Sequence, residues 1–257
     1  MQYSPAPMLD ISKIKAITLD LDDTLWPIWP TIERAEKALS AWLGPQAPGA
    51  AAVFADPQAR LALRQQVVRS QPEIGHDLSA LRRESIRLAL HRANEDTRLA
   101  EAAFEVFFTE RMQVDLFDDA RPALAFLAAR FPLVALSNGN ADVGRVGVGE
   151  FFVASLSAQE FGVGKPDPRI FHAAASSAGV ASDDVLHVGD DAALDVLGGL
   201  GAGMQTVWVN RHDHQWSHEA QPHVTVATLS ELCDLLQAAP ARPSWVVSCR
   251  LSARRPV

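Results

Sequence analysis

The sequence is poor in cysteine, in clustered basic residues and in long apolar stretches, and each shortage argues against a class of protein. Only two of its 257 residues are cysteines, too few for a disulfide framework, so we expect a reducing compartment and a cytoplasmic location. Its 31 acidic residues outnumber its 23 basic ones, and the formal net charge of −8 argues against nucleic acid as a partner. No apolar run approaches the roughly 18 residues of a membrane-spanning helix, so no membrane partner is expected.

What the chain does contain is enough apolar sequence for a sizeable core, since 48% of its residues are hydrophobic. Short runs rich in Val, Ile and Leu lack polar alternation, as expected of strands buried on both faces of a parallel sheet. They begin at Ala16, Leu133, Val185 and Gln205, with weaker candidates at Phe151 and His223. Helical patterns lie between them at 120–130, 169–178, 192–200 and 229–238. This alternation predicts an α/β fold, a Rossmannoid parallel sheet with helices on both faces.

One long segment breaks that alternation, because residues 27–113 contain no convincing strand. Amphipathic helices fit this segment at 31–43, 57–70, 78–93 and 97–112. Pro45, Pro48 and Gly49 punctuate the gap after the first of them. We therefore expect an all-α domain inserted after the first strand. The predicted division is a core of residues 14–26 and 114–239, a helical insert of residues 27–113, and a flexible tail of residues 240–257.

The first predicted strand runs into three acidic residues and a threonine, Asp20-Leu21-Asp22-Asp23-Thr24. Residues two apart in a strand point to the same side, so we expect the carboxylates of Asp20 and Asp22 to converge just past its carboxyl end. Open α/β sheets bind their ligands at that end. Two carboxylates there could hold a hard cation such as Mg²⁺, and a carboxylate can also attack phosphorus as a nucleophile.

Groups that suit a phosphate ester follow two later segments. Ser137-Asn138-Gly139 offers a hydroxyl, an amide and a glycine that lets backbone donors approach phosphate oxygens closely. Lys165, in the segment GKPDP before a predicted helix, is a point charge suited to phosphate. Each signal is weak by itself, but their appearance in order after separate strands predicts a phosphate site.

A second acidic pair follows the strand that begins at Val185. We expect Asp190 to face Asp20 across the strand ends and to complete an oxygen-rich metal site, with Mg²⁺ as the cofactor. Asp195, one helical turn onward, would support that site from behind. Asp191 either joins it or complements the dipole of the following helix.

Four segments, LDLDDTL, LSNGN, GKPDP and HVGDDAALD, resemble the motifs of the haloacid dehalogenase (HAD) superfamily, and the resemblance spans about Ile14 to Leu236. The helical insert resembles the C1-type cap of that superfamily. The resemblance implies a phosphatase in which Asp20 attacks the phosphorus and forms a phosphoaspartyl intermediate. Asp22 protonates the leaving alcohol in that step and then activates water.

The same resemblance implies a role for each remaining motif residue. Asp20, Asp190 and the backbone carbonyl of Asp22 would hold Mg²⁺, and Asp195, with Asp191, would position Lys165 or metal-bound water. Thr24 would orient the first motif beside the substrate. The residues expected to bind the phosphorylated substrate in the core are Thr24, Ser137, Asn138, Gly139 and Lys165.

Three segments, PEIGHDLSALRRESI, FPLVALSNGNADV and LHVGDDAALDVLGG, are similar to the phosphatases of bacterial flavin biosynthesis. Those enzymes act on 5-amino-6-(5-phosphoribitylamino)uracil and on FMN, so a small phosphorylated metabolite is the expected partner. The cap should supply specificity by closing over the site. His76 and Arg83 are the expected substrate contacts from the cap, and Trp26 and Trp29 could stack on a flat ring.

Other functions also fit part of this pattern. A sugar-phosphate phosphomutase of the same superfamily also keeps both Asp20 and Asp22. Dehalogenases of the superfamily attack carbon, need no metal and usually lack the second carboxylate, so Asp22 favours phosphate chemistry. A phospho-acceptor or regulatory module combines similar residues, but it is about half this length and has no helical cap. The sequence leaves monomer and homodimer equally open.

Overall fold

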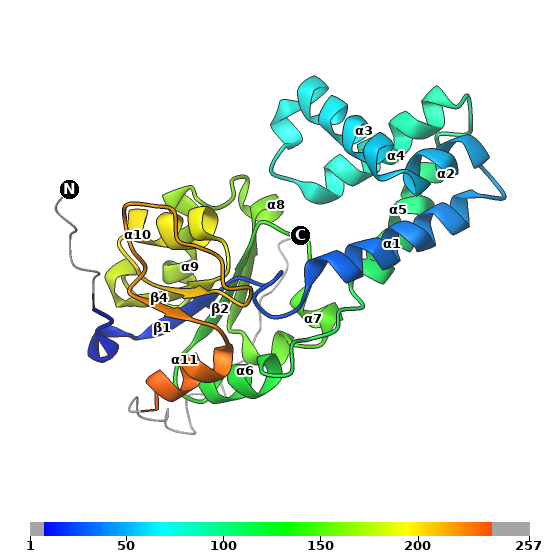
Figure 1. The fold of residues 1–257 in the computed structure, drawn as a ribbon. Coiled ribbons are helices and arrows are strands. Elements are labelled where there is room, and N and C mark those ends of the chain that lie inside the picture. The colour runs from blue at the N-terminus through cyan, green and yellow to red at the C-terminus, as the bar shows by residue number, and fades with distance from the viewer. Residues whose placement is uncertain (1–7, 238–257) are drawn as a thin grey trace, which may run out of the picture.

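The computed structural model describes residues 8–237, and the predicted tail of residues 240–257 lies outside that range. Six parallel strands form one sheet in the order β3-β2-β1-β4-β5-β6 (Figure 1). The strands are β1 (Ala16–Leu19), β2 (Leu133–Ser137), β3 (Ala154–Ser157), β4 (Val185–Gly189), β5 (Gln205–Val209) and β6 (Val224–Val226). All six predicted strands are confirmed, and the two weaker candidates form the edges of the sheet.

Helices cover both faces of the sheet, because neighbouring side chains of a buried parallel strand point to opposite sides. Ile17 and Leu19 belong to a cluster with residues of α6 (Ala120–Ala128) and α11 (Leu229–Leu235). Ala16 packs on the other side in a cluster with residues of α9 (Pro168–Ser177). The shorter helices are α7 (Val143–Val146), α8 (Ala158–Phe161) and α10 (Gly198–Gly201). The predicted α/β class, with a parallel sheet between helices, is therefore confirmed.

The helical insert forms a lobe beside the sheet, shown in blue to green at the upper right of Figure 1. Its helices are α1 (Ile28–Leu43), α2 (Pro48–Ala55), α3 (Pro57–Ser70), α4 (Leu78–Arg92) and α5 (Leu99–Arg111). Leu39, Phe54, Leu63, Ile86 and Phe104 meet in a hydrophobic cluster of their own, to which all five helices contribute. The lobe thus has a core separate from the two clusters that flank the sheet.

Helix α2 occupies the gap in which the prolines and the glycine predicted a break. Proline is tolerated in the first turn of a helix, where its missing N–H has no intrahelical partner to lose. The free N–H groups of Gly49 and Ala50 donate to the carboxylate of Glu95 at 2.7 and 2.9 Å. A distant side chain therefore completes the start of α2, and no local pattern reveals it.

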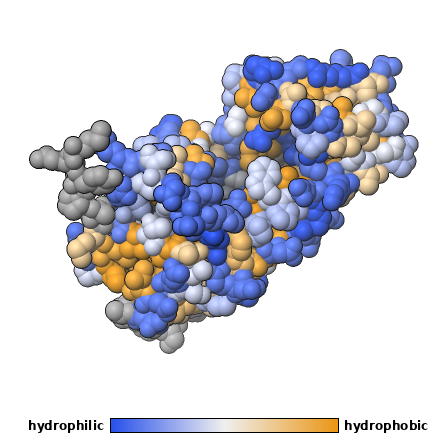
Figure 2. Space-filling model, in the orientation of Figure 1, coloured by the Kyte–Doolittle hydropathy of each residue, from blue (hydrophilic) through white to orange (hydrophobic). Residues whose placement is uncertain are grey.

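On the face shown in Figure 2, hydrophilic side chains cover much of the described residues, with apolar patches between them on both lobes. No helix between residues 8 and 237 has both the length and the apolar character that crossing a bilayer requires.

Candidate active site

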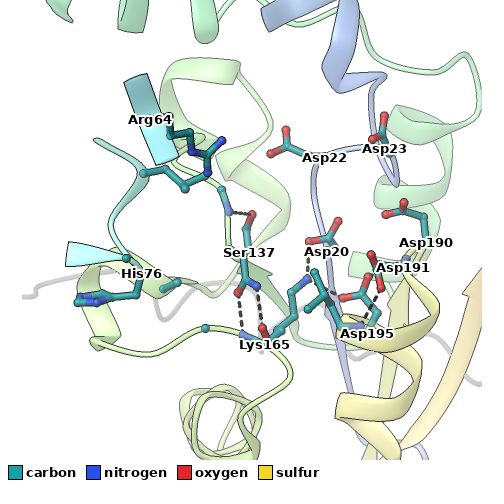
Figure 3. A pocket seen from close by; sticks show the side chains of 17 residues that line it. Asp20, Asp22, Asp23, Arg64, His76, Ser137, Lys165, Asp190, Asp191 and Asp195 are labelled. Atoms are coloured by element: carbon teal, nitrogen blue, oxygen red, sulfur yellow. Dashed lines mark hydrogen bonds and ion pairs between the residues drawn. The ribbon is translucent and has the colours of Figure 1, made fainter. Parts of the chain in front are cut away.

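The carboxyl ends of β1, β2 and β4 meet at one edge of the sheet, where a cavity of about 620 Å³ opens. The register accounts for this, since Leu19 lies beside both Ala135 and Val188, and the chain leaves the three strands at similar heights. Figure 3 shows the side chains that line the cavity. The predicted site residues among them are Asp20, Asp22, His76, Ser137, Asn138, Gly139, Lys165, Asp190, Asp191 and Asp195.

Lys165 lies at the centre of a buried ionic chain. Its Nζ donates to Asp20 Oδ1 at 2.5 Å and to Asp195 Oδ1 at 2.6 Å, and only 5% of the residue is exposed. Burial alone would lower the pKa of Lys165, but Asp195 and Asp20 raise that pKa above its usual range. The lysine is therefore a cation at neutral pH, held directly beside the carboxylate of Asp20.

Asp195 holds this lysine from behind and is itself fixed by His187. Burial opposes ionisation of Asp195, but the Lys165 ammonium and the His187 hydrogen bond together hold its pKa below the usual range. Burial lowers the pKa of His187, so its ring is neutral at pH 7. His187 Nε2 therefore donates to Asp195 at 3.0 Å, and its Nδ1 accepts from the Thr18 hydroxyl at 2.8 Å.

Asp191 starts the turn that carries Asp195. Its Oδ1 accepts from the backbone N–H groups of Ala193 and Leu194, both at 2.8 Å. The turn itself, residues Ala192–Leu197, is a π-helix, a form that often occurs at functional sites. Of the two roles considered for Asp191, the structure shows the one at the helix start.

Three carboxylates gather beside Lys165, and their oxygens suit a divalent cation. Asp20, Asp190 and Asp195 each offer an oxygen within 4.8 Å of the others. Burial raises the pKa of Asp20 despite the nearby lysine. Burial and the charge of Asp195 raise the pKa of Asp190 to about 7. A second cation, in addition to Lys165, would offset the repulsion between these carboxylates. A set of ligands made only of oxygen atoms fits Mg²⁺.

Within this acidic group the oxygens differ in availability. Those of Asp195 already accept from Lys165, from His187 and from the Asp191 N–H, which leaves Asp20 and Asp190 as the better ligands. Thr24 is fully buried beneath them, and its hydroxyl lies 3.1 Å from Asp190 Oδ1 and 3.4 Å from Asp20 Oδ2. Thr24 does not line the cavity, so it orients these carboxylates and does not reach the substrate.

The segment after β2 is organised by its own side chains. Ser137 Oγ accepts from the Gly139 N–H at 2.9 Å. The Asn138 side chain donates to the Lys165 carbonyl at 2.8 Å and accepts from the Lys165 N–H at 2.7 Å. Asn138 therefore fixes the Lys165 backbone, whereas the Ser137 hydroxyl remains at the cavity wall as a group able to meet a phosphoryl oxygen.

Asp22 lines the same cavity as Asp20, but the structure does not pair their carboxylates. Strand β1 ends at Leu19, so the two-residue alternation assumed for Asp20 and Asp22 no longer holds beyond it. Asp22 Oδ1 instead accepts from Trp26 Nε1 at 2.7 Å and from Arg111 Nη2 at 2.6 Å. Trp26 is fully buried and cannot stack on a substrate ring.

Of the two residues of the helical lobe predicted to contact substrate, one lines the cavity. His76 lines the cavity together with Arg64 of α3, which the sequence did not single out (Figure 3). Arg83 points elsewhere, since it bonds Glu101 at 3.1 Å and lies 3.7 Å from the centre of the Phe104 ring. The prediction that Arg83 contacts substrate therefore has no support in the geometry, because this side chain packs within the helical lobe.

Four residues at or beside the site were not predicted from the sequence: Thr18, Arg64, Arg111 and His187. A polar residue inside a buried strand was an available signal for Thr18 and His187, which are paired across β1 and β4. Arg64 and Arg111 carry no such signal, because charged residues on helices are usually solvated.

The sequence of this chain matches a known protein family. Residues 14–203 match the model of the haloacid dehalogenase-like hydrolases. The chain is 33% identical to the 5-amino-6-(5-phospho-D-ribitylamino)uracil phosphatase YigB of Escherichia coli, over 88% of this chain and 98% of that protein. It is also 33% identical to the phosphoserine phosphatase of Thermus thermophilus, over 85% of this chain and 98% of that protein.

A solved structure has a similar fold over most of the chain. The 2-haloacid dehalogenase from Pseudomonas syringae pv. Tomato is 38% identical, with a TM-score of 0.82 over 87% of this chain and 98% of that one. The relatives thus share one fold while their names give different substrates.

Proposed function

This chain belongs to the haloacid dehalogenase-like hydrolase family, and we propose that it is a Mg²⁺-dependent phosphatase of small metabolites that forms a phosphoaspartyl intermediate on Asp20. The observation that carries the proposal is the contact of Asp20 with Lys165 at the wall of the cavity. Phosphoryl transfer needs a nucleophile in line with the leaving oxygen and positive charge near the equatorial oxygens. Asp20 supplies the nucleophile, and Lys165 supplies one of the positive charges.

Asp22 is proposed as the acid and base of the reaction. It gives a proton to the leaving alcohol as the P–O bond breaks, and it removes a proton from the water that then attacks the phosphoaspartate. Its place in the cavity wall beside Asp20 supports this role. A dehalogenase has no alkoxide to protonate, so the presence of Asp22 favours phosphatase over the activity named for the Pseudomonas syringae relative.

Mg²⁺ would be held by Asp20, Asp190 and the Asp22 backbone carbonyl. When bound, the ion neutralises charge on the phosphoryl oxygens. Ser137 meets the phosphoryl group from the carboxyl end of β2, on the other side of β1 from Asp190. Residues 27–113 are proposed to act as the cap that covers the site.

Removal of divalent metal is expected to abolish phosphate release. Dialysis against EDTA should lower the rate with p-nitrophenyl phosphate by at least about 100-fold, and added Mg²⁺ should restore it. The reason is that the single positive charge of Lys165 does not balance the negative charge of the carboxylates and the phosphate. Asp190→Asn should raise the Mg²⁺ concentration needed for half-maximal rate by at least about tenfold. The matched variant Asp183→Asn, at the other end of β4, should leave that concentration unchanged. A rate indifferent to EDTA would remove the metal from the proposal.

The substrate is proposed to be a flavin-pathway phosphate, FMN or 5-amino-6-(5-phosphoribitylamino)uracil. The likeness to the Escherichia coli enzyme over nearly its full length supports this choice. Arg64 and His76 add a chemical reason, since both line the cavity from the cap and can donate hydrogen bonds to the carbonyl oxygens of a uracil or flavin ring. A hexose phosphate offers no such planar acceptor.

Arg64→Met is expected to lower kcat/KM for FMN by about tenfold or more, through loss of a charged hydrogen bond to the ring. The same variant should change kcat/KM for p-nitrophenyl phosphate by less than about threefold, because that ester has no ring carbonyl. Arg69→Met, on the same helix and outside the cavity, serves as the control. Equal wild-type rates for FMN and hexose phosphates would remove the flavin assignment and leave the phosphatase intact.

A further inference from the structure

Arg111 is a buried cation that has no role in the proposed phosphoryl transfer. It is the last residue of α5, and only 1% of its surface is exposed. Its Nη2 donates to Asp22 Oδ1 at 2.6 Å and to Asp22 Oδ2 at 2.8 Å. Its Nη1 is buried and has no partner among residues 8–237. Burying a guanidinium with one nitrogen unsatisfied opposes folding, so stability does not explain this placement.

Direct contact with substrate does not explain it either. Arg111 is absent from the wall of the cavity and lies behind Asp22, which does line it. The effect of Arg111 on the reaction must therefore pass through the Asp22 carboxylate.

Two further contacts leave that carboxylate little freedom. Trp26 Nε1 donates to Asp22 Oδ1 at 2.7 Å, and Trp26 is fully buried. On another side Gly139 packs so closely that a Cβ atom there would lie 2.5 Å from Asp22 Oδ2. The Asp22 side chain is thus held by donors from both connections between sheet and helical lobe, Trp26 before α1 and Arg111 at the end of α5.

We propose that Arg111 is a positioning residue which, with Trp26, fixes the Asp22 carboxylate towards the leaving-group oxygen. The inference rests on the proposed role of Asp22 as acid and base. Proton transfer requires the donor within hydrogen-bond distance of the oxygen that receives the proton, and a freely rotating carboxylate meets that condition only part of the time. Because the donors belong to the two lobe connections, the acid is aligned only where the lobe is seated as it is here.

Leaving-group dependence tests this role. An alkyl ester needs its oxygen protonated as the bond breaks, whereas p-nitrophenolate leaves readily without a proton. Moreover, kcat/KM covers only the steps up to phosphorylation of Asp20. Arg111→Met should therefore lower kcat/KM by about 100-fold for FMN and glycerol 3-phosphate, and by less than about fivefold for p-nitrophenyl phosphate. Arg111→Lys, which keeps the charge but loses the fork of donors, should fall between wild type and Arg111→Met.

A double variant sharpens the result. Arg111→Met combined with Asp22→Asn should be no slower than Asp22→Asn alone, because both changes remove the same function. Arg98→Met, an exposed arginine near the start of α5, should match wild type. Equal losses on alkyl and nitrophenyl esters, or additive losses in the double variant, would overturn the proposal.

Folding is checked by circular dichroism. If Arg111→Met does not fold, Trp26→Phe carries the test, since it removes one donor to Asp22 and retains an aromatic ring. This variant should also lose more kcat/KM on alkyl esters than on p-nitrophenyl phosphate, with a smaller difference than Arg111→Met. An equal loss on both kinds of ester overturns the proposal. Failure of the phosphatase proposal itself would look different, because wild type would then release phosphate from none of these esters.

Discussion

Asp20→Asn is expected to lower kcat for phosphate release by at least about 10⁴-fold while the protein stays folded. The amide has nearly the volume of the carboxylate but cannot attack phosphorus. Burial raises the pKa of Asp20, so the ionised side chain opposes folding in this 7% exposed position. The free energy of unfolding should therefore stay within about 1 kcal/mol of wild type or rise.

Phosphate release from p-nitrophenyl phosphate gives the rate, and urea unfolding followed by circular dichroism gives the stability. Asp213→Asn is the matched control, because this exposed loop residue has a φ of 53°, a conformation that asparagine also adopts. A variant that keeps a substantial fraction of the wild-type rate would show that Asp20 is not the nucleophile. A variant that loses both fold and rate would show that the carboxylate is needed for structure.

Lys165→Met is expected to cost both activity and stability. It removes the cation between Asp20 and Asp195 and leaves two buried carboxylates facing each other. Breaking a buried pair in this way typically costs about 3–5 kcal/mol, and the rate should fall by at least about 10³-fold because a phosphate-binding charge is lost. Urea unfolding in the presence of EDTA measures the stability without help from bound metal.

The loss of stability should depend on pH in a defined direction. Without the lysine, the buried Asp195 loses the cation that holds its pKa below the usual range, so its folded pKa rises above the unfolded value near 3.8. A carboxyl with a raised folded pKa stabilises the protein as pH falls towards the unfolded pKa. The deficit of the variant should therefore be smaller at pH 5 than at pH 8.

Lys15→Met provides the comparison for Lys165. Lys15 also pairs with an aspartate at the sheet, Asp184 at 2.8 Å, but its side chain is 63% exposed. Solvent screens an exposed pair, so it adds little to the free energy of unfolding and this variant should differ little from wild type. Similar losses for the two lysine variants would mean that the buried chain around Lys165 does not carry the stability assigned to it.

Much of the fold and of the site was predictable because it follows from periodic, local signals. Strands buried on both faces appear as short apolar runs, and their number and spacing already predict a parallel sheet with helices between. The helices of the insert were found for the same reason, and α2 was missed because Glu95, 45 residues or more away, completes its start. Edge strands β3 and β6 were the weaker predictions, since short edge strands carry weaker patterns.

The direction of individual side chains was not predictable from such signals. Asp20 and Asp22 were expected to converge just past β1, and both line the cavity, but the Asp22 carboxylate also accepts from Arg111, 89 residues away in the chain. Arg83 was expected to contact the substrate and instead donates to Glu101. Each outcome depends on which partner the packed lobe brings within reach, and a charged residue on a helix gives no sign of that in advance.

The sequence by itself determined which residues come together at this end of the sheet. Parallel strands in register have their carboxyl ends on the same side, and Asp20, Ser137 and Asp190 each lie at the end of a strand or directly after it. Only the tertiary structure decided what those residues do to one another. The seating of the helical lobe brings Arg111 against Asp22 and Arg64 into the cavity wall. These contacts depend on how the helices pack. The hydrophobic pattern of a helix determines which face is buried, but it does not determine which charged side chain beside that face contacts the other lobe.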